Sequence, residues 1–194
     1  TNDRRQRQMC IRDRNFTLKN LNLNSCPTET KFFVSNKNRE IGKNFIHKDK
    51  FNIVLGVGSS GPTTKWGVAN YSNLINKLNL ENNFYFYLLC GKNESNISNE
   101  IMDKIIKKNC SSLHNMTIKQ LIPILTSCNM YVGNDSFGSH ITSQSGIKSI
   151  VILLDSPKAY TDYSKNFYRI IPRGFDIDKI CLLYTSDAAD DRSC

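Results

Sequence analysis

The sequence contains no apolar run that approaches the ~18 residues needed to cross a bilayer. Its start is rich in arginine and no apolar segment follows, so we expect neither a membrane span nor a signal peptide. The seven cysteines form no C-x-x-C pair and match no zinc-ligand spacing. We therefore expect buried free thiols in a reducing compartment, and no metal site.

Basic blocks interleaved with aromatic residues, which are typical of nucleic-acid-binding proteins, are missing from the middle of the chain. The formal net charge is nevertheless +9 over 194 residues. Such a charge suits phosphorylated ligands or an anionic membrane face, although a generally basic soluble protein is the simpler explanation of the charge alone. We expect no nucleic-acid partner. Apolar residues make up 39% and charged residues 22%, which allows one packed domain.

The two ends of the chain differ in composition from the middle, which is rich in Asn, Lys and Ile. Residues 1–14 and 181–194 resemble translated adapter sequence, and we expect them to be foreign or disordered tails without function. The natural protein would then be longer at both ends. Between the tails we expect a linker with the first elements at 15–50 and the main domain at 51–180.

Short apolar runs and helical periodicities alternate along the middle of the chain. The predicted strands are 51–57, 83–90, 129–132, 148–154 and 167–171, and the predicted helices are 68–80, 97–108, 117–128 and 138–145. The helix at 97–108 is predicted from isoleucines on one face, which are Ile97, Ile101, Ile105 and Ile106. The segment 30–46 indicates a strand and then a helix. Alternation without hairpin signals predicts an α/β fold with a parallel sheet, helices on both faces, and ligands at the carboxyl ends of the strands.

The loop after the first predicted strand, GVGSSGPTTKWG, matches G-x-G-x-x-G from Gly56 onward. A dinucleotide-binding fold needs a helix directly after the third glycine and an acidic residue at the end of the second strand, and both are missing. A P-loop needs lysine where Pro62 stands. What remains is a hydroxyl-rich loop with Lys65, which suits phosphate oxygens. The alternative is a plain turn with Trp66 packed at the start of the helix.

A second loop lies in YVGNDSFGSH, residues 131–140, where a strand runs into a helix that begins near Gly138. Ser136 or Asp135 can cap this helix, and the N–H groups of its first turn form an anion site. Asp135 can accept hydrogen bonds from sugar hydroxyls, and His140 can contact a sugar or a phosphate. The alternative is that Asp135 only caps the helix and that His140 is a surface residue.

Four motifs occur in a fixed order along the chain. They are Gly56-x-Gly58-Ser59-Ser60…Lys65-Trp66, Gly91-x-x-Glu94, Met116-Thr117-Ile118-x-x-Leu121 and Gly133-Asn134-Asp135-Ser136…His140. In order and spacing over residues 28–180 they resemble glycosyltransferase family 9, the ADP-heptose:lipopolysaccharide heptosyltransferases. The resemblance implies a GT-B architecture of two Rossmann-like domains. This chain would be the C-terminal half, with the nucleotide-sugar-binding domain at 51–180.

The resemblance places ten residues in the donor site. They are Gly58, Ser59, Ser60, Lys65, Glu94, Met116, Asp135, Ser136, Gly138 and His140. It implies that the serines and the lysine of the first loop hold the diphosphate, that Glu94 reaches the ribose, and that the backbone near Met116 faces the adenine. The residues of the second loop would meet the phosphates and the sugar. The family reads Asp-Ser/Thr-Gly-x-x-His, whereas Phe137 here stands in the place of the glycine and Gly138 follows it.

The resemblance implies an inverting reaction with an ADP-sugar as the donor substrate and with no cofactor or metal. It also implies a lipopolysaccharide core or lipid A-type acceptor, bound by an N-terminal domain that supplies the catalytic base and is missing here. The enzyme would act in the cytoplasm at the inner face of the inner membrane, and this fragment would bind the donor without turnover. The alternatives are a GT-B domain for a UDP- or GDP-sugar, or a non-catalytic nucleotide-binding module. An NAD-binding domain is disfavoured by the missing ribose acid.

Overall fold

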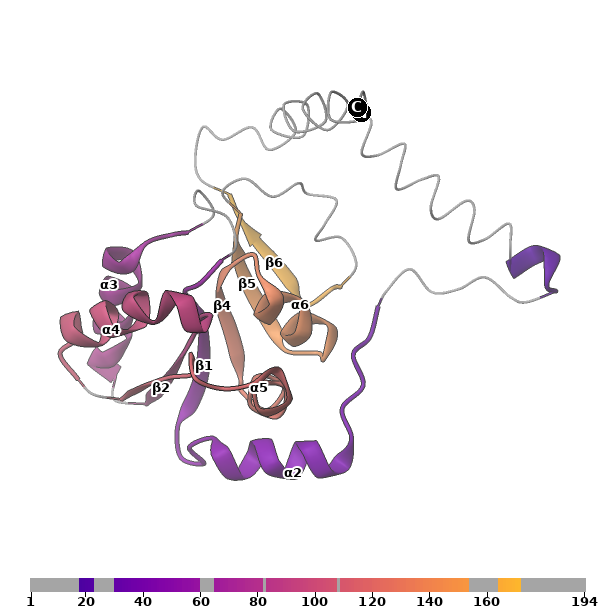
Figure 1. Ribbon diagram of the computed structural model, residues 1–194, viewed down its shortest axis with the longest axis horizontal. Coiled ribbons are helices and arrows are strands. Elements are labelled where there is room, and N and C mark those ends of the chain that lie inside the picture. Colours follow the sequence, from indigo (N-terminus) through magenta and orange to yellow (C-terminus); the bar gives the residue numbers. More distant parts are fainter. Residues whose placement is uncertain are drawn as a thin grey trace, which may run out of the picture.

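The apolar runs of the sequence form a sheet whose strands are connected through helices (Figure 1). The computed structural model describes residues 18–22, 30–59, 65–81, 83–107, 109–153 and 164–171. The strands are β1 (Phe51–Gly56), β2 (Phe84–Leu89), β3 (Cys110–Ser112), β4 (Met130–Asn134), β5 (Lys148–Ile152) and β6 (Phe167–Ile170). Their order in the sheet is β3-β2-β1-β4-β5-β6, and every neighbouring pair is parallel. The predicted parallel α/β fold is thereby confirmed.

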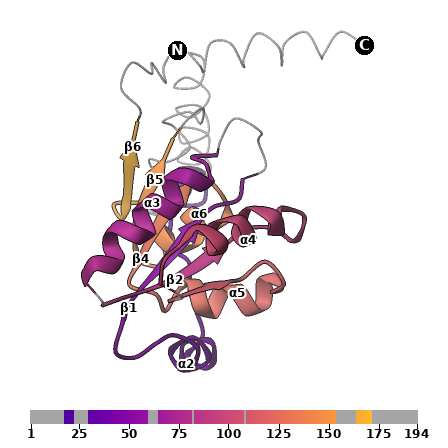
Figure 2. The same cartoon turned by 90° about the vertical axis from the view of Figure 1, so that its left-hand side faces the viewer.

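The helices lie on both faces of the sheet (Figures 1 and 2). They are α2 (Asn36–Phe45), α3 (Val68–Leu78), α4 (Ser95–Lys104), α5 (Ile118–Leu125) and α6 (Phe137–Gln144), with short 3₁₀ turns η1 (Asn79–Glu81) and η2 (Lys92–Glu94). The helices α3 and α4 bury Tyr71, Ile75 and Ile101 against one face. The helices α5 and α6 pack on the other face, and α2 packs against α5.

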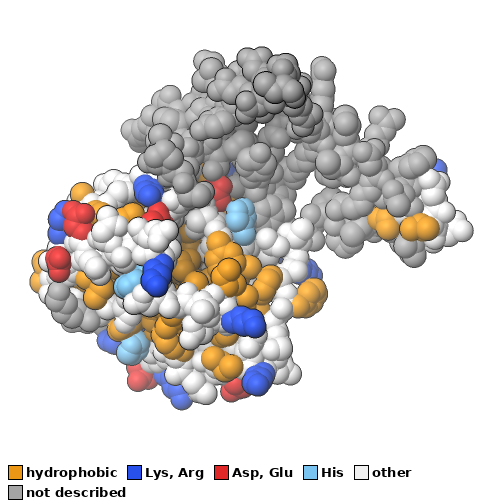
Figure 3. All heavy atoms as spheres, viewed as in Figure 1, with side chains coloured by type: hydrophobic (Ala, Val, Ile, Leu, Met, Phe, Trp, Pro, Cys, Tyr) orange, Lys and Arg blue, Asp and Glu red, His pale blue; other side chains and the backbone are white. Residues whose placement is uncertain are grey.

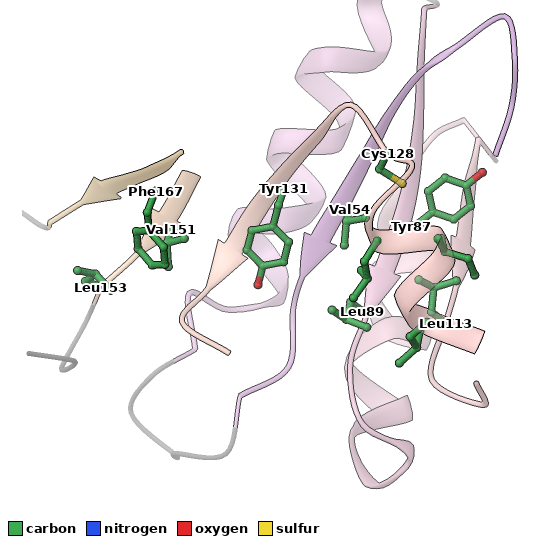
Figure 4. Packing of buried hydrophobic residues seen from close by; sticks show 12 residues of the cluster. Val54, Tyr87, Leu89, Leu113, Cys128, Tyr131, Val151, Leu153 and Phe167 are labelled. Atoms are coloured by element: carbon green, nitrogen blue, oxygen red, sulfur yellow. The ribbon is translucent and has the colours of Figure 1, made fainter. Parts of the chain in front are cut away.

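Two buried tyrosines in the core on the α5 face point in opposite directions along the sheet (Figure 4). The hydroxyl of Tyr131 is directed toward the carboxyl ends of the strands, where it donates a hydrogen bond to the Asn134 carbonyl at 2.8 Å. The hydroxyl of Tyr87 is directed toward the amino ends and lies 3.5 Å from Asn52 Oδ1. Both rings fill the core, but only Tyr131 reaches the edge where ligands of such sheets bind.

One predicted element is absent, and one predicted helix has different bounds. Residues 31–35 form no strand, because the Phe32 N–H donates to the Gln144 carbonyl, which lies at the end of a helix, and Ser35 already caps α2. The helix predicted at 97–108 begins at Ser95 and ends at Lys104. Ile105 is extended and buried, whereas Ile106 is 83% exposed. The Ile106 N–H donates to the side chain of Asn76 on α3, which replaces the next helical hydrogen bond.

The sheet has one apolar region that no described helix covers. The connections β1–α3–β2 and β2–α4–β3 run in one direction across the sheet, and the connection β4–α6–β5 runs in the opposite direction. Because such connections are right-handed, α3 and α4 lie on one face of the sheet and α6 lies on the other. Among the described residues, no helix covers the face of β4, β5 and β6 opposite α6, where an apolar hollow of about 480 Å³ lies. Its lining comprises Phe51, Ile53, Leu55, Trp66, Leu74, Leu78, Phe84, Met130, Val132, Ile150, Ile152 and Ile170.

Three cysteines lie in the described part of the chain, and the prediction of buried free thiols is confirmed for them: Cys90, Cys110 and Cys128. Burial raises the pKa of the Cys128 thiol to about 12, which keeps it protonated and unreactive. Among the described residues, none of the helices combines the length and the apolar character that a membrane crossing requires. On the face shown in Figure 3, the Lys and Arg side chains stand apart from one another rather than in one block.

Candidate functional site

The first loop of the site follows β1, and we call residues 57–59 and 65–66 the glycine loop. Ser60 and its neighbours up to residue 64 lie outside the described residues. The N–H groups of Val57 and Gly58 both donate to the Leu89 carbonyl, at 3.0 and 3.2 Å, so the loop begins tied to the end of β2. A Cβ atom at Gly58 would lie 2.3 Å from Glu94 Oε2 and 2.9 Å from the Cα of Cys90. This close approach explains the glycine at position 58.

Glu94 joins the glycine loop to the loop that follows β2. Its Oε1 lies 2.8 Å from Lys65 Nζ and accepts a hydrogen bond from the Ser59 N–H at 3.2 Å. Its Oε2 accepts from the Gly91 N–H at 3.3 Å. Burial alone would raise the pKa of the Glu94 carboxyl, but the hydrogen bonds from Lys65, Ser59 and Gly91 outweigh it and hold the pKa below its ordinary value. The carboxylate is therefore charged at neutral pH and fixes one lysine at the edge of the sheet.

This arrangement predicts a pH-dependent contribution to stability. A carboxyl whose pKa is lower in the folded chain stabilises the fold above its unfolded pKa, here about 4.5, and the contribution disappears as the pH falls through the folded value. Glu94→Gln should therefore be less stable than the unaltered chain at about pH 7, and the difference should narrow as the pH falls to about 3. Urea denaturation at several pH values measures the difference. A difference that stays constant or widens toward acid would contradict this origin of the stability.

The second loop of the site follows β4, and we call residues 135–136 the Asp-Ser loop. Ser136 is extended, with φ −160°, and is the N-cap of α6. Its N–H donates to Ser139 Oγ at 3.2 Å, and its own Oγ lies 3.2 Å from the hydroxyl of Tyr131. Of the two caps that the sequence allowed, the structure has Ser136, and the helix begins one residue before Gly138. The positive end of α6 thus faces the carboxyl edge of the sheet beside Asp135.

Asp135 and His140 form a pair across the first turn of α6. The distance between His140 Nε2 and Asp135 Oδ1 is 3.4 Å, and the same carboxylate oxygen accepts from Ser139 Oγ at 3.2 Å. The Asp135 side chain is 10% exposed, whereas that of His140 is 37% exposed. The pair therefore presents an imidazole to solvent and holds a carboxylate behind it. The N-cap of α6 is Ser136 and not Asp135. The alternative that Asp135 only caps the helix is therefore excluded.

Phe137 causes no backbone strain at the position where the family pattern resembled in the sequence would have glycine. It is the first residue of α6, and Asn22 is the only non-glycine residue with positive φ in the described part of the chain. The position that requires glycine is 138, since a Cβ atom there would lie 2.4 Å from Leu89 Cδ2 and 2.8 Å from the Tyr131 ring. Gly138 therefore lets α6 approach β2 and β4, and Phe137 is left 41% exposed at the mouth of the site.

The predicted site residues fall into two groups and one outlier. Gly58, Ser59, Lys65 and Glu94 meet at the ends of β1 and β2, and Asp135, Ser136, Gly138 and His140 meet at the end of β4. Met116 follows β3, two strands from β1, and packs against the core on the α5 face. In the described part of the chain, no group of three or more His, Cys, Asp or Glu side chains is placed to hold a metal ion.

Asn134, which was not among the predicted site residues, is fully buried at the end of β4. Its Nδ2 donates to the Val57 carbonyl, and its Oδ1 accepts from the Trp66 N–H, both at 3.0 Å. The hydroxyl of Tyr71 lies 3.0 Å from the same Oδ1 and 2.8 Å from the Gly56 carbonyl. A polar residue between a strand and Asp135 was visible in the sequence, but its partners lie more than sixty positions away.

The two groups flank the point in the sheet where the chain changes direction. The chain runs outward from β1 to β2 and β3 on one side of this point, and from β4 to β5 and β6 on the other side. The glycine loop leaves β1 and the Asp-Ser loop leaves β4 at the same edge. Ligands of open parallel sheets bind in the crevice at such a switch point. Fold and site together define an α/β domain of the doubly wound class, with its candidate site at the switch point.

The comparison with protein families gives a definite result. The profile of glycosyltransferase family 9 (heptosyltransferase) matches residues 1–171, and the chain belongs to this family. The family that the four sequence motifs resembled is thereby confirmed. Among curated proteins, no sequence matches the chain.

Solved structures of the family have the same fold at low sequence identity. The Escherichia coli ADP-heptose lps heptosyltransferase II is 15% identical with a TM-score of 0.65, over 84% of this chain and 54% of that chain. The E. coli heptosyltransferase WaaC with ADP is 14% identical with a TM-score of 0.67, over 90% and 53%. A family 9 glycosyl transferase from Veillonella parvula DSM 2008 is 12% identical with a TM-score of 0.66, over 84% and 47%. The chain thus spans about half the length of these GT-B enzymes.

Proposed function

We propose that this chain is the donor-binding, C-terminal half of a glycosyltransferase that transfers heptose or a related sugar from an ADP-sugar to a lipopolysaccharide core acceptor. The observation that carries the proposal is the pair of loops at the switch point between β1 and β4. One loop brings a lysine to the crevice and the other brings the N-terminus of a helix. Membership of family 9 supports sugar transfer, and the names of two similar structures include ADP-heptose and ADP.

The diphosphate of the donor is expected between Lys65 and the first turn of α6. A lysine ammonium is a compact point charge for phosphate oxygens, and the N–H groups of a helix N-terminus bind anions with the favourable sign of the dipole. Ser59 and Ser60 would add backbone and hydroxyl donors. Lys65 is paired with Glu94 at 2.8 Å, so phosphate binding would exchange one anionic partner for another. The released carboxylate of Glu94 would then accept hydrogen bonds from the ribose hydroxyls, and the backbone near Met116 would face the adenine.

The Asp-Ser loop would face the bond that breaks. In the reaction an acceptor hydroxyl attacks the anomeric carbon, the bond from that carbon to the diphosphate oxygen breaks, and negative charge develops on the departing ADP. Lys65 and the positive end of α6 would stabilise that charge, as fixed charges and dipoles do in enzyme sites. Asp135 and His140 would hold the sugar hydroxyls, with Ser136 and Gly138 shaping the start of the helix. No metal or cofactor enters this proposal.

The rest of the reaction belongs to the whole enzyme. The acceptor and the base that takes the proton of its hydroxyl are expected in an N-terminal domain, at the cytoplasmic face of the inner membrane. General-base catalysis contributes about 10²–10⁴-fold, and positioning of the acceptor adds more. The chain by itself should therefore bind the donor and its nucleotide without measurable sugar transfer.

Nucleotide preference tests the proposal. Calorimetric titration of the 194-residue chain with ADP, UDP, GDP and NADH is expected to give the tightest binding for ADP. The reason is that the base would lie against the loop around Met116, whereas the phosphates meet the same groups in all four ligands. Fluorescence of Trp66, the single tryptophan of the chain, gives a second readout beside the diphosphate.

The other outcomes of this titration have definite meanings. Tighter binding of UDP or GDP would assign a different sugar donor to the same site. Tight NADH binding with weak ADP binding would exclude the proposed function. If a folded chain bound none of the four ligands, the family membership would describe its fold but not a working donor site.

A further inference from the structure

The two loops of the site are joined by one buried side-chain amide. Asn134 donates to the carbonyl of Val57 and accepts from the N–H of Trp66, at 3.0 Å each. These two residues are the first and the last of the glycine loop. The amide belongs to the residue directly before Asp135, so a single planar group contacts both ends of one loop and begins the other.

The bonding at this point requires an amide rather than another polar group. The Val57 carbonyl needs a donor, while the Trp66 N–H and the Tyr71 hydroxyl lie at the same acceptor oxygen. Asparagine supplies a donor and an acceptor from one short side chain without charge. An aspartate would lack the donor and would place a charge in a fully buried position, which is costly.

The backbone of Asn134 continues the connection into the Asp-Ser loop. Its carbonyl accepts from the hydroxyl of Tyr131 at 2.8 Å, and that hydroxyl also lies 3.2 Å from Ser136 Oγ. Tyr131 has little freedom, because a Cβ atom on Gly56 would lie 1.8 Å from its hydroxyl oxygen and one on Gly138 would lie 2.8 Å from its ring. The hydrogen bonds thus run without interruption from the glycine loop to the N-cap of α6.

We propose that Asn134 is a positioning residue that couples the glycine loop to the Asp-Ser loop, so that the two loops bind a nucleoside diphosphate as one preformed unit. The inference rests on the proposed function for the identity of the ligand. Asn134 does not touch the ligand in this proposal; it acts through Trp66 and Val57, which fix the neighbouring Lys65 and Gly58, and through Ser136. Without the amide, the ligand itself must order the two loops, and that ordering weakens binding.

Asn52 offers a matched control for Asn134. It is also buried, and its Oδ1 accepts the His47 N–H at 3.1 Å while its Nδ2 donates to the carbonyls of His47 and Lys50 at 2.8 and 2.7 Å. A tyrosine hydroxyl, that of Tyr87, lies 3.5 Å from its Oδ1. Asn52 thus has the same kinds of partners, but it lies at the opposite end of β1, away from the site.

The test compares Asn134→Ala with Asn52→Ala in the whole chain. Both variants lose a buried amide and should lose comparable stability in urea denaturation. Only Asn134→Ala should raise the Kd for ADP, by about tenfold or more. The Kd is measured without urea, at a temperature at which both variants are folded. Only Asn134→Ala should also increase the quenching of Trp66 fluorescence by acrylamide, because the backbone N–H of Trp66 loses its acceptor.

Two results would overturn the proposal. One is an ADP affinity of folded Asn134→Ala equal to that of Asn52→Ala, since the amide would then serve stability alone. The other is unchanged acrylamide quenching of Trp66, which would mean that the glycine loop holds its place without Asn134. If the unaltered chain binds no nucleotide, the proposed function fails, and the quenching comparison still decides whether Asn134 holds the loop.

Discussion

Lys65→Ala is expected to weaken ADP binding between about 10- and 100-fold, because hydrogen bonds to charged groups contribute about 1.5–3 kcal/mol each. Among the described residues, Lys65 is a cation at the carboxyl edge of the sheet, 2.8 Å from Glu94 and adjacent to Trp66. Its removal would take away the positive charge that is proposed to contact the diphosphate. It would also leave the negative charge of Glu94 unneutralised beside the phosphates of the ligand. Calorimetric titration of the variant with ADP measures the change directly.

Lys104→Ala is the matched control for this prediction. Lys104 also pairs with a glutamate, Glu100, at 2.6 Å, but it lies on the exposed side of α4 and both side chains are about half exposed. Its removal lowers the net charge by the same amount, so a general electrostatic effect would appear in both variants. An ADP affinity that falls equally in the two would show that overall charge, not Lys65, attracts the nucleotide. Unchanged affinity in Lys65→Ala would leave that lysine only the role of a partner for Glu94.

Gly133→Ala is expected to destabilise the fold by about 3 kcal/mol or more, at the upper end of the usual range for overpacking. Gly133 is opposite Gly56 in the pairing of β4 with β1. A Cβ atom at Gly133 would lie 2.5 Å from the Gly56 nitrogen and 2.6 Å from its Cα and carbonyl oxygen. All three are backbone atoms, which cannot turn aside as a flexible side chain can, so the two central strands must separate. Urea denaturation measures the loss of unfolding free energy.

Gly91→Ala provides the comparison at the same edge of the sheet. Gly91 has φ −71°, and a Cβ atom there would have its nearest neighbour, Glu94 Oε2, at 3.6 Å, an ordinary contact. A glycine-to-alanine change at such a position is expected to be neutral or to stabilise by about 0.4–1 kcal/mol. If Gly133→Ala were as well tolerated as Gly91→Ala, the close contact of β1 and β4 would not be a constraint on the fold.

Most of the fold was predictable from the sequence because the strands other than β3 contain short apolar runs. β3 (Cys110–Ser112) has only one apolar residue and was not predicted. Phe51–Gly56 ends one residue before the predicted strand 51–57, and Phe84–Leu89 is one residue shorter at each end than the predicted strand 83–90. The errors arose where tertiary contacts decide the local structure. Ile106 fits the helical spacing of α4, but the side chain of Asn76 takes its N–H. Phe33 lies in a run that resembles a strand, but it is 85% exposed and pairs with none of the described strands.

The site was predictable as a set of residues but not as a set of contacts. The parallel sheet brings the loops after β1, β2 and β4 to one edge, and this follows from the alternation of elements. The pairing of Lys65 with Glu94 does not follow from the sequence, because it depends on side-chain conformations in two loops that lie 29 positions apart. The same holds for Asn134, whose buried hydrogen bonds are satisfied only after β1 and β4 have met.

The apolar hollow over β4, β5 and β6 has a practical consequence for anyone who works with this chain. Dyes such as anilinonaphthalene sulfonate become fluorescent in apolar surroundings, and their binding is commonly taken as a sign of a loosened core. Here the described part of the native fold forms a hollow of about 480 Å³ lined by twelve apolar residues. Dye that binds in this hollow would become fluorescent without any unfolding. Near-ultraviolet circular dichroism, which follows the packing of the buried tyrosines, is the appropriate measure of the native state.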